Sequence, residues 1–195
     1  MANMARPRTV SDAAILDAAA AAVAECGPAA VTLARIGSRA GVTAAALSQR
    51  FGSKRDLLLA LARRAAATMP ARLAAARDAE QPARALIETF AELAGGISGP
   101  AEFANHLQFL LLDLSDPQFR EVTRGYAEAV EAAIATVLDA AARAGELPAP
   151  RAGLPRAVHA AYNGALITWG MTGDGSPAEA VRTQLTRVLT RPVDE

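Results

Sequence analysis

One stretch, residues 32–54, most restricts how this chain can fold, because its pattern predicts two short helices joined by a tight turn. Thr32 precedes apolar residues at helical spacing, and its hydroxyl can accept a hydrogen bond from a free backbone N–H at the helix start. Gly41 tolerates the left-handed backbone that ends a helix, and Thr43 can cap a second helix over residues 44–50. This layout is that of the DNA-binding helix-turn-helix, although an ordinary helical hairpin has the same spacing. The stretch alone therefore leaves a DNA-reading unit and a packing corner open.

The sequence around this stretch has a characteristic order. A helix ending in AECG is followed by AGVT at the turn and by GSKRDLL after the second helix. In this order, over about residues 11–61, the chain resembles the N-terminal domain of the TetR family of bacterial transcriptional regulators. The resemblance places at the family's DNA-contacting positions Thr32, Thr43, Ser48, Gln49 and Lys54. The chain departs from the family at Ser48, where a tyrosine is usual, so the aromatic contact with a phosphate is missing.

The outer face of the second helix offers limited chemistry for reading bases. Gln49 can present a bidentate amide to adenine, Ser48 can donate to a base or phosphate, and the alanines offer methyl groups to thymine. Arg39 and Arg50 could contact phosphate or guanine, although a solvated surface charge is the commoner role of a single arginine. Lys54, at the start of the next helix, could reach a phosphate beside the helix N-terminus. The predicted DNA-binding residues are Thr32, Arg39, Thr43, Ala44, Ser48, Gln49, Arg50 and Lys54.

The composition predicts an all-α protein. Of the 195 residues, 52% are hydrophobic and many are alanine, which favours helix, and no alternating Val, Ile and Thr run predicts a strand. We expect a helix-turn-helix DNA-binding domain over residues 1–55 and a larger helical effector-binding and dimerisation domain over residues 56–195. About nine helices are expected, near residues 11–27, 33–40, 44–50, 54–69, 82–94, 101–114, 117–144, 155–171 and 177–190.

The formal net charge is zero, but the charges are unevenly distributed along the chain. Residues 1–55 contain seven basic and three acidic side chains, whereas residues 56–195 contain 13 basic and 17 acidic ones. This asymmetry fits a basic domain that faces DNA, attached to an acidic body. Arg6 and Arg8 precede the first helix and could enter a minor groove, although an unstructured tail is the commoner arrangement.

Neither secretion nor membrane insertion is expected from the sequence. The longest uncharged apolar run, residues 157–173, contains His159, Asn163 and Thr168, which makes it short and polar for a membrane span. Acidic residues interrupt the N-terminal region where a signal peptide would have its apolar core. Cys26 is the only cysteine, so no intrachain disulfide can form. We therefore expect a cytoplasmic protein.

The second half contains no motif that predicts an enzyme. It has no glycine-rich phosphate loop and no nucleophile elbow, and its two histidines lack the spacing of metal ligands, so we expect no cofactor and no metal. Aromatic and polar residues instead gather on the helices over residues 101–171. The predicted effector pocket consists of Phe103, His106, Phe109, Tyr126, Tyr162, Asn163 and Trp169. Core filling is the alternative role of these residues. Because the set has no lysine or arginine, an apolar or aromatic ligand suits it better than a polyanion.

The TetR resemblance implies how such a chain would work. The last two helices would form a homodimer, and the middle helices would bind a small-molecule effector. We expect a transcriptional repressor that binds a palindromic operator as a dimer and is released by a small apolar or aromatic effector. Two alternatives stay open: a helical enzyme or carrier without a DNA role, and a DNA-binding regulator without small-molecule control.

Overall fold

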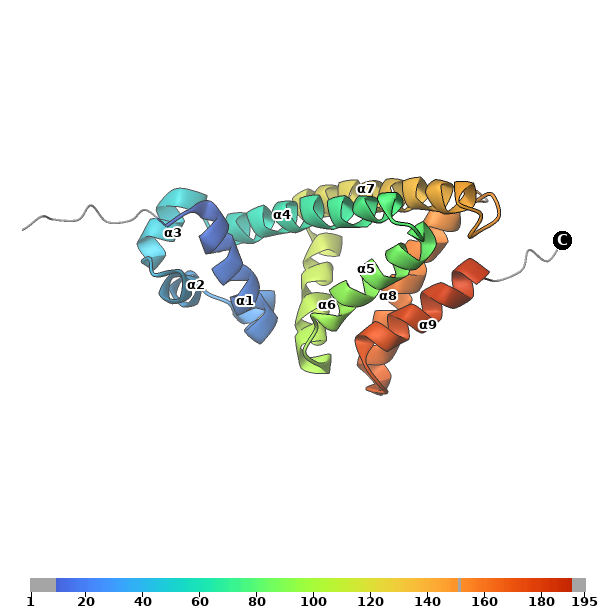
Figure 1. Ribbon diagram of the computed structural model, residues 1–195. Helices are drawn as coiled ribbons and strands as arrows, with labels where there is room; N and C mark the ends of the chain where they lie inside the picture. The colour runs from blue at the N-terminus through green and yellow to red at the C-terminus, as the bar shows by residue number, and fades with distance from the viewer. Residues whose placement is uncertain (1–9, 151, 191–195) are drawn as a thin grey trace, which may run out of the picture.

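The computed structural model describes residues 10–150 and 152–190, and within them the chain is helical without a strand, which confirms the all-α prediction. Figure 1 shows α1–α3 gathered at one end, with α4 leading away from them beside α7. Arg6 and Arg8 lie outside the described residues. The helices are α1 Asp12–Ala30, α2 Leu33–Ala40, α3 Ala44–Phe51, α4 Lys54–Ala75, the short 3-10 helix η1 Ala76–Asp78, α5 Pro82–Gly95, α6 Pro100–Ser115, α7 Pro117–Arg143, α8 Leu154–Thr172 and α9 Pro177–Thr190.

Side-chain caps define the N-terminal helices as the sequence predicts. Thr32 Oγ1 accepts from the N–H of Arg35 at 3.1 Å, and Thr43 Oγ1 accepts from the N–H of Ala46 at 3.0 Å. Gly41 between the two helices has φ 72° and ψ 29°, the left-handed conformation that glycine adopts without steric cost. The predicted helix-turn-helix is therefore present.

A kink ends the regular part of α1 at the predicted place. Gly27 has φ 76°, and a Cβ there would lie 2.6 Å from Gln108 Oε1 on α6. Glycine adopts this positive φ without steric cost, and a Cβ would also require the Gln108 side chain to move. Beside the kink, Asn105 on α6 donates from Nδ2 to the carbonyl of Ala24 at 2.7 Å. The end of α1 is thus held against α6.

The chain has two hydrophobic cores, and α4 contributes to both. Ile15, Ile36, Leu47 and Leu57 are fully or almost fully buried in the N-terminal core. Leu73, near the other end of α4, lies in the C-terminal core formed mainly by α5, α7, α8 and α9. The N-terminal core therefore extends past residue 55 into α4, and this helix connects the two ends of the molecule.

The two ends also meet at the start of α7. Phe119 on α7 is 1% exposed and packs in the N-terminal core. Arg55 at the start of α4 donates to both carboxylate oxygens of Asp116, the N-cap of α7, at 2.7 and 2.8 Å. The Arg55 guanidinium also lies 5.8 Å from the centre of the Phe119 ring. This junction fixes the first turns of α4 and α7 to each other.

By length and composition, α1 alone among the described helices could span a membrane. Its apolar residues Ile15, Ala19 and Val23 are instead buried in the N-terminal core, and charged Asp17 and Glu25 lie on its exposed face. The helix is therefore accounted for by packing within the domain.

Candidate nucleic-acid interface and effector cavity

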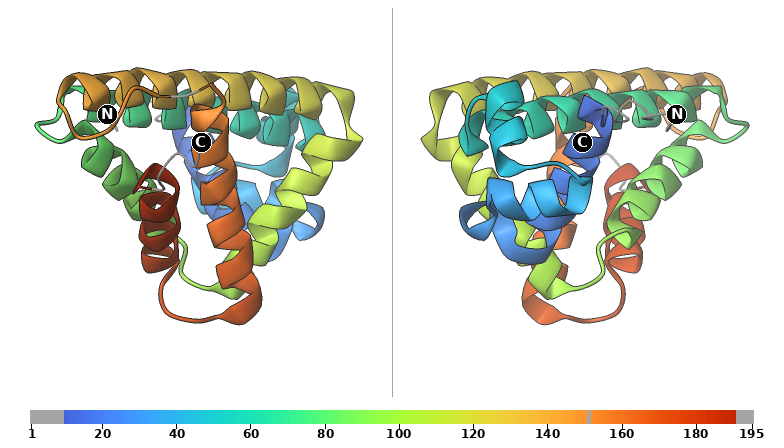
Figure 2. Two further views of the ribbon diagram at one scale, coloured as in Figure 1. Left: turned by 90° about the vertical axis from the view of Figure 1, so that its right-hand side faces the viewer. Right: turned by 90° about the vertical axis from the view of Figure 1, so that its left-hand side faces the viewer.

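The second helix of the helix-turn-helix, α3, lies on the surface at one end of the molecule. Figure 2 shows this end and the opposite end, which carries α8 and α9. Leu47 is fully buried and anchors α3 to its own domain, whereas Ser48, Gln49 and Arg50 are exposed. The side chain of Gln49 has no hydrogen-bond partner in the described part of the chain. Ala44 is half-buried at the first turn. The face expected to read DNA is thus accessible.

Three hydroxyls predicted to contact DNA already take part in helix ends. Thr32 and Thr43 accept from backbone N–H groups as caps, and Ser48 Oγ donates to the carbonyl of Gly52 at 2.9 Å. The single hydroxyl hydrogen of Ser48 is therefore used within the protein, and its oxygen is left to accept. The DNA contacts of all three residues stay predictions.

The two arginines predicted to contact DNA form ion pairs within the N-terminal domain. Arg39 donates to Glu25 Oε1 from Nη1 at 2.8 Å, and Arg50 pairs with Asp12 at the start of α1. Arg50 also donates to the carbonyl of Val10 at 2.5 Å. Because these pairs are exposed, each arginine can exchange its carboxylate for a phosphate at small cost.

Lys54 has an unexpectedly complete set of partners. Its Nζ donates to the carbonyls of Pro28, Ala29 and Val31 at 3.1, 2.9 and 2.9 Å. An ammonium group has three hydrogens, so all of them are engaged. The half-buried Lys54 thus ties the α1–α2 connection to the start of α4. A phosphate contact by Lys54 remains a prediction, and it would have to compete with these bonds.

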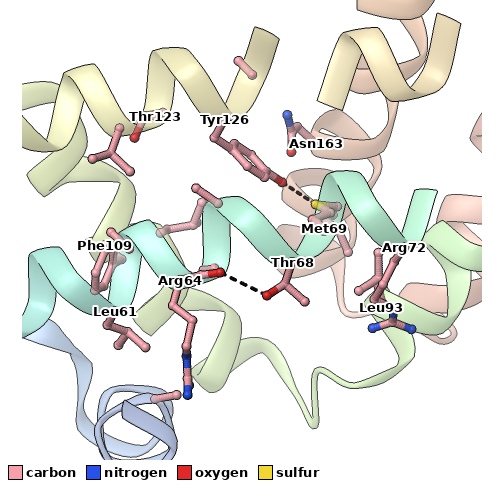
Figure 3. A pocket seen from close by; sticks show the side chains of 18 of the residues that line it. Leu61, Arg64, Thr68, Met69, Arg72, Leu93, Phe109, Thr123, Tyr126 and Asn163 are labelled. Carbon is pink, nitrogen blue, oxygen red and sulfur yellow. Dashed lines mark hydrogen bonds between the residues drawn. The ribbon is translucent and has the colours of Figure 1, made fainter. Parts of the chain in front are cut away.

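A cavity of about 1010 Å³ is lined by residues of α1, α4, α5, α6, α7 and α8. Figure 3 shows its lining, which is largely apolar. Four of the seven predicted pocket residues line it: Phe103, Phe109, Tyr126 and Asn163. The volume is at the upper end of what small-molecule sites have.

The other three predicted pocket residues lie elsewhere. Tyr162 is buried in the C-terminal core, where its ring lies 4.6 Å from that of Phe90. Trp169 packs edge-on against Phe103 and donates from Nε1 to the carbonyl of Gly175 at 3.2 Å. His106 is exposed on α6. Residue type alone did not separate these positions, because the direction of each side chain depends on how its helix packs.

Buried polar groups lie along the α7 and α8 side of the cavity. The Tyr126 hydroxyl donates to Met69 Sδ, and burial raises the pKa of Tyr126 to about 12. The His159 ring packs edge-on against Tyr126, and burial lowers the pKa of His159 against a smaller opposing effect of Glu131. Both groups are therefore uncharged at neutral pH. Together with Asn163, they offer a ligand hydrogen bonds without charge.

The charged groups of the cavity come from α4 and α1, and the sequence analysis did not predict them as pocket residues. Arg64, Thr68 and Arg72 recur every fourth residue and so share one face of α4. Arg64 forms an ion pair with Asp17 Oδ1 on α1 at 2.8 Å, and its Nη1 donates to the carbonyl of Ala13 at 3.0 Å. Figure 3 shows Arg64, Thr68 and Arg72 along one side of α4. The expectation of a cavity without arginine is therefore corrected. The spacing of four is visible in the sequence, but it does not indicate that this face of α4 lines a cavity.

No group of three or more His, Cys, Asp or Glu side chains that could hold a metal ion occurs among the residues that the structure describes. Cys26 is half-buried, and its thiol lies 3.1 Å from the carbonyl of Ala22 in the preceding helical turn.

The N-terminal domain is similar to a known family. Residues 15–61 match the family model described as bacterial regulatory proteins, tetR family. The matched region contains the helix-turn-helix and the first turns of α4, which confirms the resemblance seen in the sequence. No curated protein is significantly similar to the chain in sequence.

Solved structures match almost the whole chain. A member of the TetR family from Streptomyces coelicolor is 26% identical, with 93% of this chain and 98% of that chain covered and a TM-score of 0.64. A putative transcriptional regulator from Saccharomonospora viridis, in complex with choline, is 22% identical, with 92% and 95% covered and a TM-score of 0.74. SmeT, the repressor of the Stenotrophomonas maltophilia multidrug efflux pump SmeDEF, is 22% identical, with 93% and 89% covered and a TM-score of 0.68, and its triclosan complex also matches. These likenesses establish the fold of both halves.

Proposed function

The chain belongs to the tetR family of bacterial regulatory proteins through its N-terminal domain, and from this premise we propose that it is a ligand-responsive repressor acting as a homodimer in the bacterial cytoplasm. A DNA-binding transcriptional regulator is what its family and fold support. To this general role the proposal adds a palindromic operator, a homodimer and a small-molecule effector.

The observation that carries the proposal is the exposed face of α3. Gln49 projects without a hydrogen-bond partner in the part of the chain that the structure describes, next to exposed alanines, on a helix anchored by buried Leu47. An amide without internal partners can donate to and accept from adenine. We expect Gln49 to determine one base of each operator half-site.

We propose that α8 and α9 form the dimer interface. The exposed face of α8 carries Ala157, Ala160, Gly164 and Met171, and the Met171 side chain is 77% exposed. Small residues allow two helices to approach closely, and an exposed methionine is expected to be covered by a partner. Two copies would then present their α3 helices about one DNA turn apart, roughly 34–36 Å, which requires a palindromic operator.

Glycine substitutions test the dimer without disturbing the subunit. A Cβ at Gly164 meets no atom within 4 Å, so Gly164→Arg is expected to fold but to sediment as a monomer and to lose operator binding. Gly125 on α7 also has open space within 4 Å, and Gly125→Arg should remain a dimer. An unchanged dimer in Gly164→Arg would exclude α8 as the interface.

We propose that the cavity binds a small, mainly apolar or aromatic effector. Its lining combines apolar side chains with the uncharged Tyr126, His159 and Asn163. Similar regulators form complexes with choline and with triclosan, which supports small-molecule binding as a role of this chain. An effector that binds better to the conformation unable to engage DNA would release the operator, with a coupling of about 1–3 kcal/mol.

One experiment tests the regulator itself. Selection from random DNA, followed by mobility shifts at several salt concentrations, should yield an inverted repeat that the dimer shifts and that selected effectors release. A reporter gene placed behind this sequence should be less expressed when the protein is present. Turnover of a ligand without a salt-dependent DNA shift would favour the enzyme or carrier instead. A DNA shift that no small molecule changes would favour a regulator without effector control.

A further inference from the structure

The cavity is not closed within the effector body, because it reaches the DNA-binding domain. Asp17 and Ala20 of α1 belong to its lining together with residues of α4, α6, α7 and α8. Asp17 is also the carboxylate that pairs with Arg64 at 2.8 Å. One ion pair at the edge of the cavity therefore links the DNA-binding domain to the helix that runs into the body.

The charges along the cavity favour an anion over a cation. Within the lining, Arg64 and Arg72 contribute two guanidinium groups and Asp17 contributes one carboxylate, while Glu92, outside the lining, pairs with Arg72 at 3.8 Å. The lowered pKa of His159 keeps that ring neutral. The remaining lining is apolar or uncharged. A ligand with an apolar body and one acidic group would match this distribution.

Arg64 is the better placed of the two arginines to receive such a group. Its side chain is 33% exposed, against 47% for Arg72, so water competes less for it. A guanidinium binds a carboxylate through two parallel hydrogen bonds, which makes the contact directional. Arg64 is also the arginine whose present partner belongs to the other domain.

The present partner of Arg64 can be displaced easily. The Asp17 side chain is 74% exposed, so its carboxylate returns to water when it leaves the arginine. Exposed ion pairs contribute little to stability for this reason. An incoming carboxylate that brings an apolar body into the cavity gains burial that Asp17 does not have.

We infer that the effector is an amphipathic monocarboxylic acid. Its carboxylate replaces Asp17 as the partner of Arg64, while its apolar part enters the cavity. This inference rests on the proposed function and names the ligand class and the release step. Loss of the Arg64–Asp17 pair removes one of the contacts between α1 and α4 beside the cavity, where Arg64 also donates to the carbonyl of Ala13. DNA binding weakens because the position of α3, which packs with α1 in the N-terminal core, is then less fixed. Reciprocally, operator DNA weakens binding of the acid by the same factor.

A matched series of probes tests the ligand class. Straight-chain and phenyl-substituted acids are compared with alcohols and amines of the same length, using the intact dimer. Trp169, the only tryptophan, packs against the cavity residue Phe103, so its fluorescence reports binding. Acids should bind about tenfold more tightly than their alcohols, as expected for a charge-assisted hydrogen bond. Equal affinity, or a preference for amines, overturns the inference.

Variants of the ion pair test the displacement. Arg64→Gln should remove the preference for acids, whereas Arg63→Gln, an exposed neighbour outside the cavity lining, should keep it. Asp17→Asn removes the competitor, so acids should bind about threefold more tightly or better, yet release DNA less effectively. A purely structural ion pair would not raise acid affinity when Asp17 is replaced. Weaker or unchanged acid binding by Asp17→Asn therefore overturns the displacement.

Operator binding is measured separately by fluorescence anisotropy of labelled DNA. If alcohols bind and release the operator but acids have no advantage, the proposed regulator stands and the inference on its ligand fails. If the protein binds no operator, the proposed function fails whatever the acids do.

Discussion

Two regions of this molecule, the DNA-reading end formed by α1–α3 and the body formed by α5–α9, differ in how far apart along the chain their contacting residues are. At the DNA-reading end, each helix begins with a cap that joins residues three apart, as Thr32 and Arg35 do. In the body, Tyr126 bonds Met69 across 57 residues, and Arg182 bonds Glu88 across 94. Local rules therefore determine the first region, whereas the shape of the second depends on how whole helices pack.

This difference means that the two regions should tolerate substitutions differently. The reading end needs few residues to fold, and its outer face can change one side chain at a time. The cavity beside the body is lined by residues of six helices, so many substitutions can alter it. The helix α4 contributes to both cores and transmits changes from one region to the other.

The largest expected effect comes from the core beneath the reading helix. Leu47 is fully buried, so Leu47→Ala should lower the free energy of unfolding by about 2–5 kcal/mol and abolish operator binding. Because Leu47 lies in the N-terminal core only, ligand binding read from Trp169 should survive at low temperature. Chemical denaturation and fluorescence titration measure the two effects. Ala45→Ser, on the exposed face of α3, is the control that should leave stability nearly unchanged.

Substitution of Lys54 shows whether this lysine serves a structural contact or a DNA contact. Lys54→Met would leave the carbonyls of Pro28, Ala29 and Val31 without this donor, and we expect a loss of about 1–3 kcal/mol in unfolding free energy. Arg63→Met, which changes an exposed cation on the same helix, should cost much less. If Lys54→Met instead kept full stability and reduced the salt dependence of operator binding by about one unit of slope, the lysine would contact phosphate.

Substitution of Gly170 perturbs the body and is expected to leave the DNA-reading end unchanged. A Cβ at this position would lie 2.5 Å from the Phe103 ring, which lines the cavity. Gly170→Ala should therefore shift Phe103, cost about 1–3 kcal/mol and alter effector affinity and Trp169 emission. Operator affinity without effector should be retained. A variant that binds effector normally but fails on DNA would contradict the separation of the two regions.

Sequence reasoning succeeded where contacts are local and failed where they are not. The caps Thr32 and Thr43, the left-handed Gly41 and the helix end at Gly27 could all be read from neighbouring residues. The cavity could be predicted only in part. Phe103 and Tyr126 face it, but Tyr162 turns into the core, since packing against Phe90 determines its direction.

The charged groups were missed for the same physical reason. Arg64 appears in the sequence as a surface residue of a long helix, and its partner Asp17 lies on the first helix. Nothing in either local pattern indicates that the kinked α1 and α4 bring them to one cavity. Likewise, the three carbonyl partners of Lys54 become visible only once the α1–α2 connection is placed beside α4. The contacts that join the two regions are thus the least predictable part of the molecule.

The smallest expected effect concerns the junction between Arg55 and Asp116. The Arg55 guanidinium, reinforced by N–H groups of Gln118 and Phe119 against a smaller desolvation effect, holds the pKa of Asp116 below its usual value. A carboxyl with a depressed pKa stabilises the folded state above its unfolded pKa, about 3.9, and loses this contribution as the pH falls through the folded value.

Asp116→Asn keeps a cap oxygen for α7 but removes the charge. Its unfolding free energy should therefore lie slightly below that of the original protein at neutral pH, and the difference should narrow below about pH 4. Denaturant titrations across this range, repeated in Arg55→Met, measure it. A difference that stays constant with pH, or that persists in Arg55→Met, would show that the cap rather than the ion pair joins the two regions.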